Sequence, residues 1–244
     1  ENKMKMNKYI DMHCHILPGV DDGAKHLKDT KEMLEIAYQE GIRAIVATPH
    51  HHDRRGKASI QQLNCQLQKV KELIQEMNMN MKVYPGMEVF FVQEILDELD
   101  QGIIATIGKS RYILIEFSPE APFSYIQRAV QEVQMKGYRV IIAHVERYSC
   151  LTKNIDKIRS LVEMGAYIQV NASSIIGGFT IKHFMKSIMK EHLVHLVGTD
   201  AHDPNHRSPL MRKAAIYVER KHGHAYMEQI FWRNGVAVLR NEKI

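Results

Sequence analysis

The chain has few of the features that place a protein in a membrane, on nucleic acid or in a disulfide framework. None of its 244 residues belongs to an apolar run long enough, at about eighteen residues, to span a bilayer, so we expect no transmembrane segment. The basic residues 1–8 are not followed by an apolar stretch, and we therefore expect no secretory signal peptide. Lysine and arginine give a net charge of +5 but are dispersed along the chain, which predicts no nucleic-acid partner.

Cysteine is scarce as well. Cys14, Cys65 and Cys150 are widely spaced and form no CxxC pair, and an odd number argues against a disulfide framework. We therefore expect a reducing, cytoplasmic compartment. A cysteine-dependent phosphatase would need an arginine six residues beyond its nucleophile to cradle the phosphate. None of the three cysteines has one, so that mechanism is excluded.

What the sequence does have is a regular alternation of apolar β-branched runs and amphipathic stretches. Seven segments are expected to form strands: residues 9–12, 44–48, 83–88, 112–117, 140–144, 167–171 and 195–199. Helical periodicity marks residues 29–40, 60–77, 125–136, 154–164, 210–221 and 225–232. Alternating strands and helices predict an α/β fold with a parallel sheet, and this many units close naturally into a barrel. We find no linker or repeat, and expect residues 1–244 to form a single domain.

Nine histidine and acidic residues stand at the ends of six of these strands or just beyond them. They are His13, His15 and Asp22 after the first strand, His50 after the second, Glu88, Glu116 and His144 at the ends of the third, fourth and fifth, and Asp200 and His202 after the seventh. In a barrel the C-terminal ends of the strands converge on one face, where active sites lie. One histidine or acidic residue at the end of a strand is unremarkable, but nine at the ends of six strands predict a functional site.

Five imidazoles and four carboxylates brought together need compensating charge, because like charges repel. Divalent cations supply it, and the His-x-His spacing lets both rings of an extended segment reach one ion. Nitrogen and oxygen donors without thiolate favour Mn²⁺, Fe²⁺, Mg²⁺ or Zn²⁺. Nine ligands imply two or three ions with a bridging carboxylate, and three ions would leave a formal charge of +2 that attracts a phosphate dianion. We interpret His51 and His52 as bystanders.

The order of these motifs resembles a known family. Segment 11–23 (Asp-Met-His-Cys-His-Ile-Leu-Pro-Gly-Val-Asp-Asp-Gly) is followed by motifs at 48–51, 86–88, 115–117, 143–148 and 199–202. The series, which covers nearly the whole chain, resembles the polymerase and histidinol phosphatase (PHP) superfamily of metal-dependent phosphoesterases. More narrowly, it resembles the bacterial manganese-dependent protein-tyrosine phosphatases of capsule and exopolysaccharide loci. The resemblance implies a distorted (β/α)7 TIM-like barrel with its metal site at the C-terminal ends of the strands.

Carried over residue by residue, the resemblance implies one ion held by His13, His15, Glu88 and Asp200, a second by Glu88, Glu116 and His144, and a third by Asp22, His50 and His202. Arg147 and Arg207 match the family's phosphate-binding arginines, although Arg207 follows a variable loop. Asp22 stands where the wider superfamily often has histidine. Val145 replaces the proline of the more usual His-Pro-Glu-Arg motif.

The activity implied is hydrolysis of phosphotyrosine by a metal-bridging hydroxide, with manganese favoured and Cys14 dispensable. The implied partner is an autophosphorylated bacterial tyrosine kinase, and the oligomeric state stays open. Three alternatives also stay open. The first is another phosphoesterase of the superfamily, such as a histidinol phosphatase or a nuclease. The second is an amidohydrolase barrel, although Glu116 stands where its bridging lysine would be. The third is a metal-dependent regulatory module without turnover.

Overall fold

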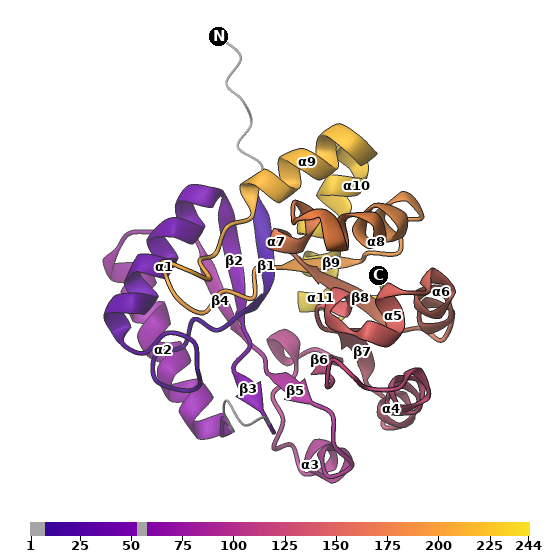
Figure 1. The fold of residues 1–244 in the computed structure, drawn as a ribbon. Coiled ribbons are helices and arrows are strands. Elements are labelled where there is room, and N and C mark those ends of the chain that lie inside the picture. The colour runs from indigo at the N-terminus through magenta and orange to yellow at the C-terminus, as the bar shows by residue number, and fades with distance from the viewer. Residues whose placement is uncertain (1–7, 53–57) are drawn as a thin grey trace.

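The structure, a computed structural model, describes residues 8–52 and 58–244. Residues 1–7, which make up most of the basic segment considered above, lie outside the described part. Parallel strands curl around a common interior, and helices pack on their outer side (Figure 1). No helix in the described ranges combines the length and apolarity needed to cross a bilayer.

The strands form two sheets in which every pairing is parallel. The smaller sheet has the order β1 (Tyr9–Cys14), β2 (Ile42–Ala47) and β4 (Lys82–Pro85). The larger has the order β3 (His50–His51), β5 (Glu88–Phe90), β6 (Tyr112–Glu116), β7 (Arg139–Ile142), β8 (Tyr167–Asn171) and β9 (Leu196–Gly198). A single bridge between Cys14 and Ala201 joins the end of β1 to the segment after β9.

All seven expected strand segments are present, but the described residues form nine strands, because β3 follows beyond the expected segment 44–48 and the segment 83–88 is broken in two. Residues 48–49 separate β2 from β3, and Pro49 has no N–H to donate to a ladder. Residues 86–87 separate β4 from β5. A Cβ at Gly86 would lie 2.9 Å from the Ile107 side chain and 3.0 Å from that of Val46, so this approach requires glycine. The parallel α/β fold is confirmed, whereas the number of strands differs from seven.

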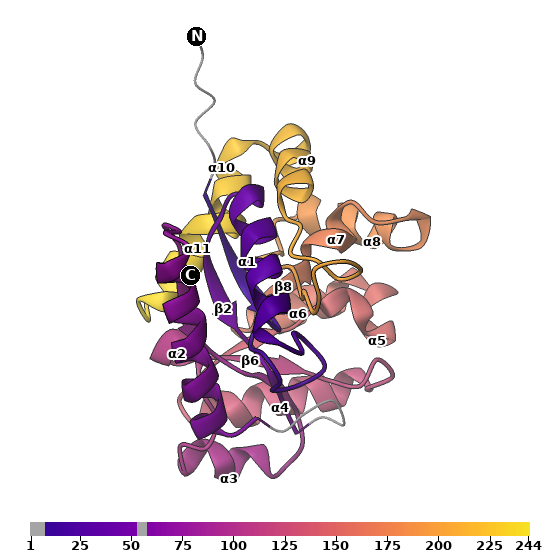
Figure 2. The same ribbon diagram turned by 90° about the vertical axis from the view of Figure 1, so that its left-hand side faces the viewer.

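The helices follow the predicted periodicity and lie close to the predicted bounds. They are α1 (Leu27–Glu40), α2 (Ile60–Glu76), α3 (Ile95–Asp100), α4 (Phe123–Met135), α5 (Ser149–Thr152), α6 (Ile155–Glu163), α7 (Ala172–Ile175), α8 (Phe179–Lys190), α9 (Arg212–His222), α10 (His224–Glu228) and α11 (Asn234–Leu239). Helices α1 and α2 lie side by side on the outer face of the smaller sheet (Figures 1 and 2). Helices α3, α5, α7, α8 and α11 were not expected, whereas α10 lies in the expected range 225–232.

Two apolar cores hold these layers together. The larger lies between the strands and the outer helices, and includes Met33 and Leu34 of α1. The smaller fills the interior of the curled sheets with inward-facing residues such as Ile10 and Leu114, and Val238 of α11 belongs to it. Each fully buried side chain of this size contributes roughly 1.5–3 kcal/mol. Since the interior is packed, the strands present their functional side chains only where they end.

Candidate metal centre

The backbone at the end of β1 turns two imidazoles to one side and the intervening thiol to the other. The Nε2 atoms of His13 and His15 lie 3.2 Å apart. Cys14 is fully buried among apolar residues, with its sulfur 3.9 Å from the Ala201 carbonyl oxygen. Burial raises the pKa of this thiol well above its ordinary value. Cys14 therefore faces away from the imidazoles and is not a nucleophile.

Neighbouring oxygens determine which nitrogen of each imidazole carries the proton. His13 Nδ1 lies 3.3 Å from the Gln169 Oε1 atom, and His15 Nδ1 lies 2.7 Å from the Asp21 Oδ2 atom. Both oxygens are acceptors, because Gln169 Oε1 also accepts the His144 N–H at 2.8 Å. Each Nδ1 therefore donates, and each Nε2 keeps a lone pair directed into the centre.

Two carboxylates complete this first group. Glu88 Oε2 lies 3.2 Å from Nε2 of both His13 and His15. Asp200 Oδ1 lies 3.5 Å and 3.4 Å from the same two atoms. All four side chains are almost fully buried. Four lone-pair atoms thus converge on one point, which is the environment of a divalent cation.

A second group shares Glu88 with the first. His144 Nε2 lies 2.7 Å from Glu88 Oε1 and 3.7 Å from Glu116 Oε2. His50 approaches the same carboxylates, with its Nδ1 3.0 Å from Glu88 Oε2 and 3.2 Å from Glu116 Oε1. The two oxygens of Glu88 therefore face different groups of nitrogen atoms, which is the arrangement of a bridging carboxylate.

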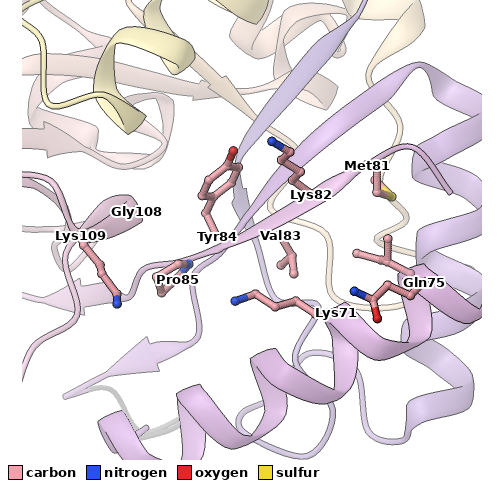
Figure 3. A pocket seen from close by; sticks show the side chains of 10 residues that line it. Lys71, Gln75, Met81, Lys82, Val83, Tyr84, Pro85, Gly108 and Lys109 are labelled. Carbon is pink, nitrogen blue, oxygen red and sulfur yellow. The ribbon is translucent and has the colours of Figure 1, made fainter.

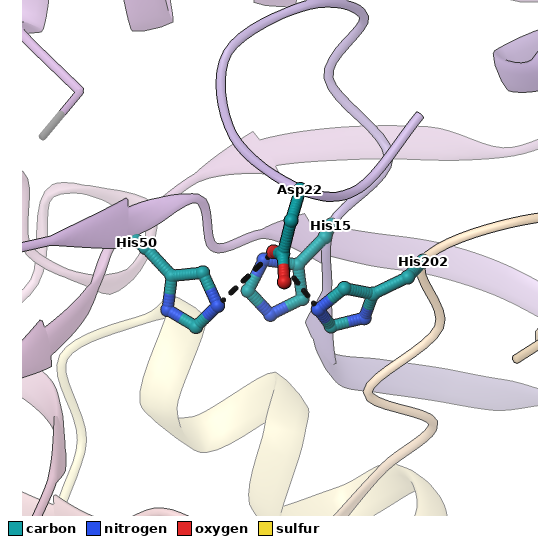
Figure 4. A group of neighbouring side chains, drawn as sticks. All are labelled: His15, Asp22, His50 and His202. Carbon is teal, nitrogen blue, oxygen red and sulfur yellow. Dashed lines mark ion pairs between the residues drawn. The ribbon is translucent and has the colours of Figure 1, made fainter. Parts of the chain in front are cut away.

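Asp22 organises a third group from the loop after β1 (Figure 4). Its Oδ1 atom lies 3.4 Å from His50 Nε2 and 3.3 Å from His202 Nε2. His202 Nδ1 faces the Asp200 carbonyl oxygen at 2.9 Å, which leaves its Nε2 with a lone pair. His15 is close enough to belong to this group too. All nine predicted residues are thus brought together; their role as ligands remains a prediction.

The fit to metal ions can be tested on the buried polar atoms. Within the described ranges, both ring nitrogens of His50, Oε2 of Glu88 and Nε2 of His202 have neighbours at ion-pair distance but form no hydrogen bond of acceptable geometry. Buried polar groups in proteins are nearly always hydrogen-bonded, so such a cluster requires an explanation. All these atoms point at the three groups. The donor set therefore fits divalent cations, which would bind the carboxylate oxygens and one ring nitrogen of each imidazole.

The carboxylates and imidazoles of the centre stabilise one another's charged forms. Burial raises the pKa of Glu88, but attraction and hydrogen bonds from the surrounding histidines outweigh it and hold the pKa well below its usual range. Burial lowers the pKa of His50, but the carboxylates of Asp22, Glu116 and Glu88 raise it to about 10. The two shifts show that the imidazoles stabilise the negative charge of Glu88 and that the carboxylates stabilise positive charge on His50.

Backbone strain occurs at two of the nine residues. His144 and Asp200 have φ angles of 29° and 53°, in the left-handed region that residues other than glycine rarely adopt. Each follows the end of a strand, where the chain turns so that its side chain enters the centre. Such strain costs on the order of 1–3 kcal/mol per residue and is typical of functional sites.

The two predicted arginines meet at the rim of the centre. Arg147, in a 3₁₀ turn at Val145–Arg147, forms an ion pair with the Oδ2 atom of Asp200. Arg207 Nη2 lies 2.9 Å from that same Oδ2 atom. The arginine side chains are 37% and 39% exposed, whereas that of Asp200 is 2% exposed. Both guanidinium groups therefore reach from solvent to the edge of the buried centre.

Sequence reasoning missed the polar residues of β8, the one strand to which it assigned no site residue. Gln169 Nε2 donates to Asn171 Oδ1 at 3.1 Å, and Asn171 Nδ2 donates to Asp200 Oδ2 at 3.0 Å. Together with the bonds of Gln169 to His13 and His144, these form one continuous chain of hydrogen bonds. The signal in the sequence was two amides at alternate positions of an otherwise apolar strand. Asp21 was missed because its neighbour Asp22 took the predicted role.

His51 and His52 do not join the nine residues. Their Nε2 atoms lie 2.7 Å and 2.8 Å from Glu98 Oε2, in a separate cluster beside α3. A cavity of about 460 Å³ between α2 and β4 is also separate (Figure 3). Its lining, which includes Lys71 and Tyr84, contains no carboxylate or imidazole, so it cannot hold the ions expected here.

A curled parallel sheet with nitrogen and oxygen donors at the C-terminal ends of its strands is the arrangement of metal-dependent hydrolases built on α/β barrels. The sequence matches the family described as "Capsular polysaccharide synthesis, CpsB/CapC" over residues 9–240. The chain belongs to this family. The relationship inferred from the motifs is therefore confirmed.

Named relatives and a solved structure agree with this assignment. The chain is 34% identical over 240 residues to tyrosine-protein phosphatase YwqE of Bacillus subtilis (strain 168), covering 96% of this chain and 93% of YwqE. It is 31% identical over 242 residues to tyrosine-protein phosphatase CpsB of Streptococcus pneumoniae, covering 96% and 100%. Crystal structures of YwqE and CpsB are described as those of unique metal-dependent tyrosine phosphatases. The matched chain has a TM-score of 0.90 and 32% identity, with 96% of both chains covered.

Proposed function

We propose that this chain is a metal-dependent protein-tyrosine phosphatase. The observation that carries the proposal is the position of Glu88, whose two oxygens face separate groups of imidazoles beneath a pair of arginines. Such a centre holds a phosphate dianion between metal ions and guanidinium groups. The relatives at 31% and 34% identity are named tyrosine phosphatases, which supports phosphotyrosine as the substrate.

We propose three ions, held by His13, His15, Glu88 and Asp200; by Glu88, Glu116 and His144; and by Asp22, His50 and His202. Nitrogen and oxygen donors without thiolate suit Mn²⁺, Fe²⁺, Mg²⁺ or Zn²⁺, and among these we favour Mn²⁺ because the resemblance to the manganese-dependent phosphatases implies it. When bound, the ions neutralise the carboxylates, bind phosphate oxygens and lower the pKa of the water that attacks phosphorus.

The protein side chains position the phosphate and balance its charge. Arg147 and Arg207 already point to one carboxylate at the rim, and each guanidinium has further N–H donors for equatorial phosphate oxygens. The chain of amides from Gln169 to Asn171 holds His13, His144 and Asp200 in place while the charge on the phosphate changes. No side chain is required to form a covalent phosphoenzyme.

Four broader features belong to the same proposal. The two sheets are taken as one distorted (β/α)7 barrel, in which β2 with β3 and β4 with β5 each count as one broken strand, and residues 1–244 as one domain. The cellular substrate is taken to be an autophosphorylated bacterial tyrosine kinase, which the family's role in capsular polysaccharide synthesis supports. Cys14, Cys65 and Cys150 are free thiols, which supports a cytoplasmic location.

A comparison of leaving groups tests the activity. Protein loaded with Mn²⁺ is assayed on a phosphotyrosine peptide, a phosphoserine peptide, histidinol phosphate and single-stranded DNA. We expect turnover of the phosphotyrosine peptide to exceed that of the others, to stop with chelator and to return with Mn²⁺. Preference for histidinol phosphate or DNA would support the other phosphoesterases. Metal binding without turnover of any substrate would support a regulatory module.

A further inference from the structure

A cavity of about 480 Å³ lies against the rim of the metal centre. Asp200, Arg147 and Arg207 form one side of its wall, so it is continuous with the proposed phosphate position. The remaining wall comes from the end of α1, the end of β8, α7 and the residue after it, the loop after β9 and the start of α9. A cavity of this size is in the range that binds small ligands. Its position allows a group attached to the phosphate to extend into it.

Two apolar side chains on this wall are exposed to solvent. Ile176, directly after α7, is 46% exposed, and Leu210, just before α9, is 54% exposed. Of the large apolar side chains exposed in the described residues, these two line the cavity beside the arginines. Exposed apolar surface at the edge of a charged site is typical of a binding surface. It provides a place for a flat, apolar group linked to the phosphate.

The charges around the cavity favour an anionic ligand. The Glu40 carboxylate accepts hydrogen bonds from the backbone N–H groups of Met211 and Arg212, at 3.0 Å and 2.8 Å, so this oxygen is directed at the start of α9; Glu40 and Asp200 are the two carboxylates of the lining, against the three cations Arg147, Arg207 and Lys213. Asp200 is paired with both arginines. Lys213 lines the same cavity and has no carboxylate within ion-pair distance among residues 8–52 and 58–244. One positive charge therefore faces the cavity without a partner.

We propose that this cavity binds the aromatic ring and the adjoining backbone of an acidic peptide that carries phosphotyrosine. The inference rests on the proposed function and specifies its substrate. The phosphate lies at Arg147 and Arg207, the ring packs against Ile176 and Leu210, and an acidic side chain next to the tyrosine lies at Lys213. Aromatic rings contribute a large contact area at low entropic cost, so two aliphatic contacts are enough to affect affinity.

Steady-state kinetics of the Mn²⁺-loaded protein test the ring contact. The variant Ile176→Ala/Leu210→Ala is compared with wild type and with Ile216→Ala, a control on α9 that is 45% exposed and does not line the cavity. We expect kcat/KM on a phosphotyrosine peptide to fall about fivefold to tenfold in the double variant, mainly through KM, from the loss of apolar contact. The control should stay at the wild-type value. Inhibition by inorganic phosphate, which needs only the metals and arginines, should stay within about twofold of wild type in both variants.

A double variant with wild-type kcat/KM would overturn the ring contact, as would an equal weakening of phosphate inhibition.

For the acidic contact, Lys213→Gln is assayed on two peptides that carry glutamate or alanine next to phosphotyrosine. We expect Lys213→Gln to lower kcat/KM several-fold on the glutamate peptide and to leave kcat/KM on the alanine peptide unchanged. An equal fall on both peptides would contradict the acidic contact. If wild type binds Mn²⁺ and phosphate but hydrolyses neither peptide, the proposed function itself fails, which distinguishes that failure from the others.

Discussion

At the residue scale, the centre depends on the hydrogen bond that each histidine forms through the ring nitrogen facing away from the centre. His15 presents Nε2 inward only because the carboxylate of Asp21 fixes the proton on Nδ1, at 2.7 Å. The same carboxylate accepts N–H bonds from Gly23 at 2.9 Å and from His50 at 3.0 Å, so it also fixes the loop. Such outer partners orient the ligands of metal ions and raise their basicity.

We expect Asp21→Ala to weaken binding of Mn²⁺ by roughly 10–100-fold, because His15 loses the group that selects its tautomer. Asp21→Asn, which keeps one oxygen acceptor, should lose less. Calorimetric titration of metal-free protein measures both affinities. Equal affinity of Asp21→Ala and wild type would contradict the orienting role.

Arg147 is partly exposed, as is Asp22 but none of the other eight acidic and imidazole residues, and it reaches the centre from the rim. We expect Arg147→Ala to lower kcat on an aryl phosphate by roughly 10²–10³-fold, because a donor to the phosphate in the transition state is lost. Metal content should stay near the wild-type level. Arg159→Ala, which removes an exposed ion pair with Glu191, is the control. Unchanged kinetics of Arg147→Ala would exclude a role in phosphate binding.

At the scale of elements, the centre depends on the close approach of β1 and β9. Asp200 N donates to the His13 carbonyl oxygen at 2.7 Å, and His15 N donates to that of Ala201 at 2.9 Å. Gly198 makes this contact possible, because a Cβ there would lie 2.5 Å from His13 Cβ. The two strands thus place their ligands in register only if this position has no side chain.

Gly198→Ala should therefore separate the strands, lower the free energy of unfolding by roughly 1–3 kcal/mol and weaken metal binding. Gly178→Ala is the control, since a Cβ at Gly178 would meet no atom within 4 Å. Urea unfolding and Mn²⁺ titration measure the two effects. A Gly198→Ala variant with wild-type stability and metal affinity would show that the approach is not required.

A partly buried histidine with reduced proton affinity lies directly before β9 and contacts β8. His195 Nδ1 accepts the Ile168 N–H at 3.1 Å, and burial lowers the pKa of His195 to about 4. Because the folded pKa lies below that of the unfolded chain, at about 6.5, the unfolded state binds more protons between these values. Stability should therefore fall as the pH falls from about 6.5 to 4.

His195→Gln should remove this dependence, which amounts to about 2 kcal/mol between pH 7 and pH 5. Urea unfolding is measured at both pH values with chelator present, so that release of metal does not contribute. The wild type should lose more stability on acidification than His195→Gln. Parallel losses in the two proteins would show that His195 is not responsible.

At the scale of the whole molecule, some features could be predicted from sequence and others depend on tertiary contacts. The strand segments could be predicted because β-branched runs and their ends are local features. The nine candidate ligands could be predicted because parallel strands end on one face. The break between β4 and β5 could not, since it depends on the side chains that surround Gly86. Neither could the capping of α9 by Glu40, whose partners lie 171 and 172 residues further along the chain.

Titration of metal-free protein with Mn²⁺, with bound ion and phosphotyrosine hydrolysis followed together, is the most direct test of the proposed centre. We expect no hydrolysis before metal is added, full hydrolysis when two or three ions are bound per chain, and loss of both bound ion and hydrolysis in Glu88→Gln. Hydrolysis by wild-type protein shown by elemental analysis to be free of metal would contradict the proposed mechanism. Full activity of Glu88→Gln would contradict the bridging role of this carboxylate.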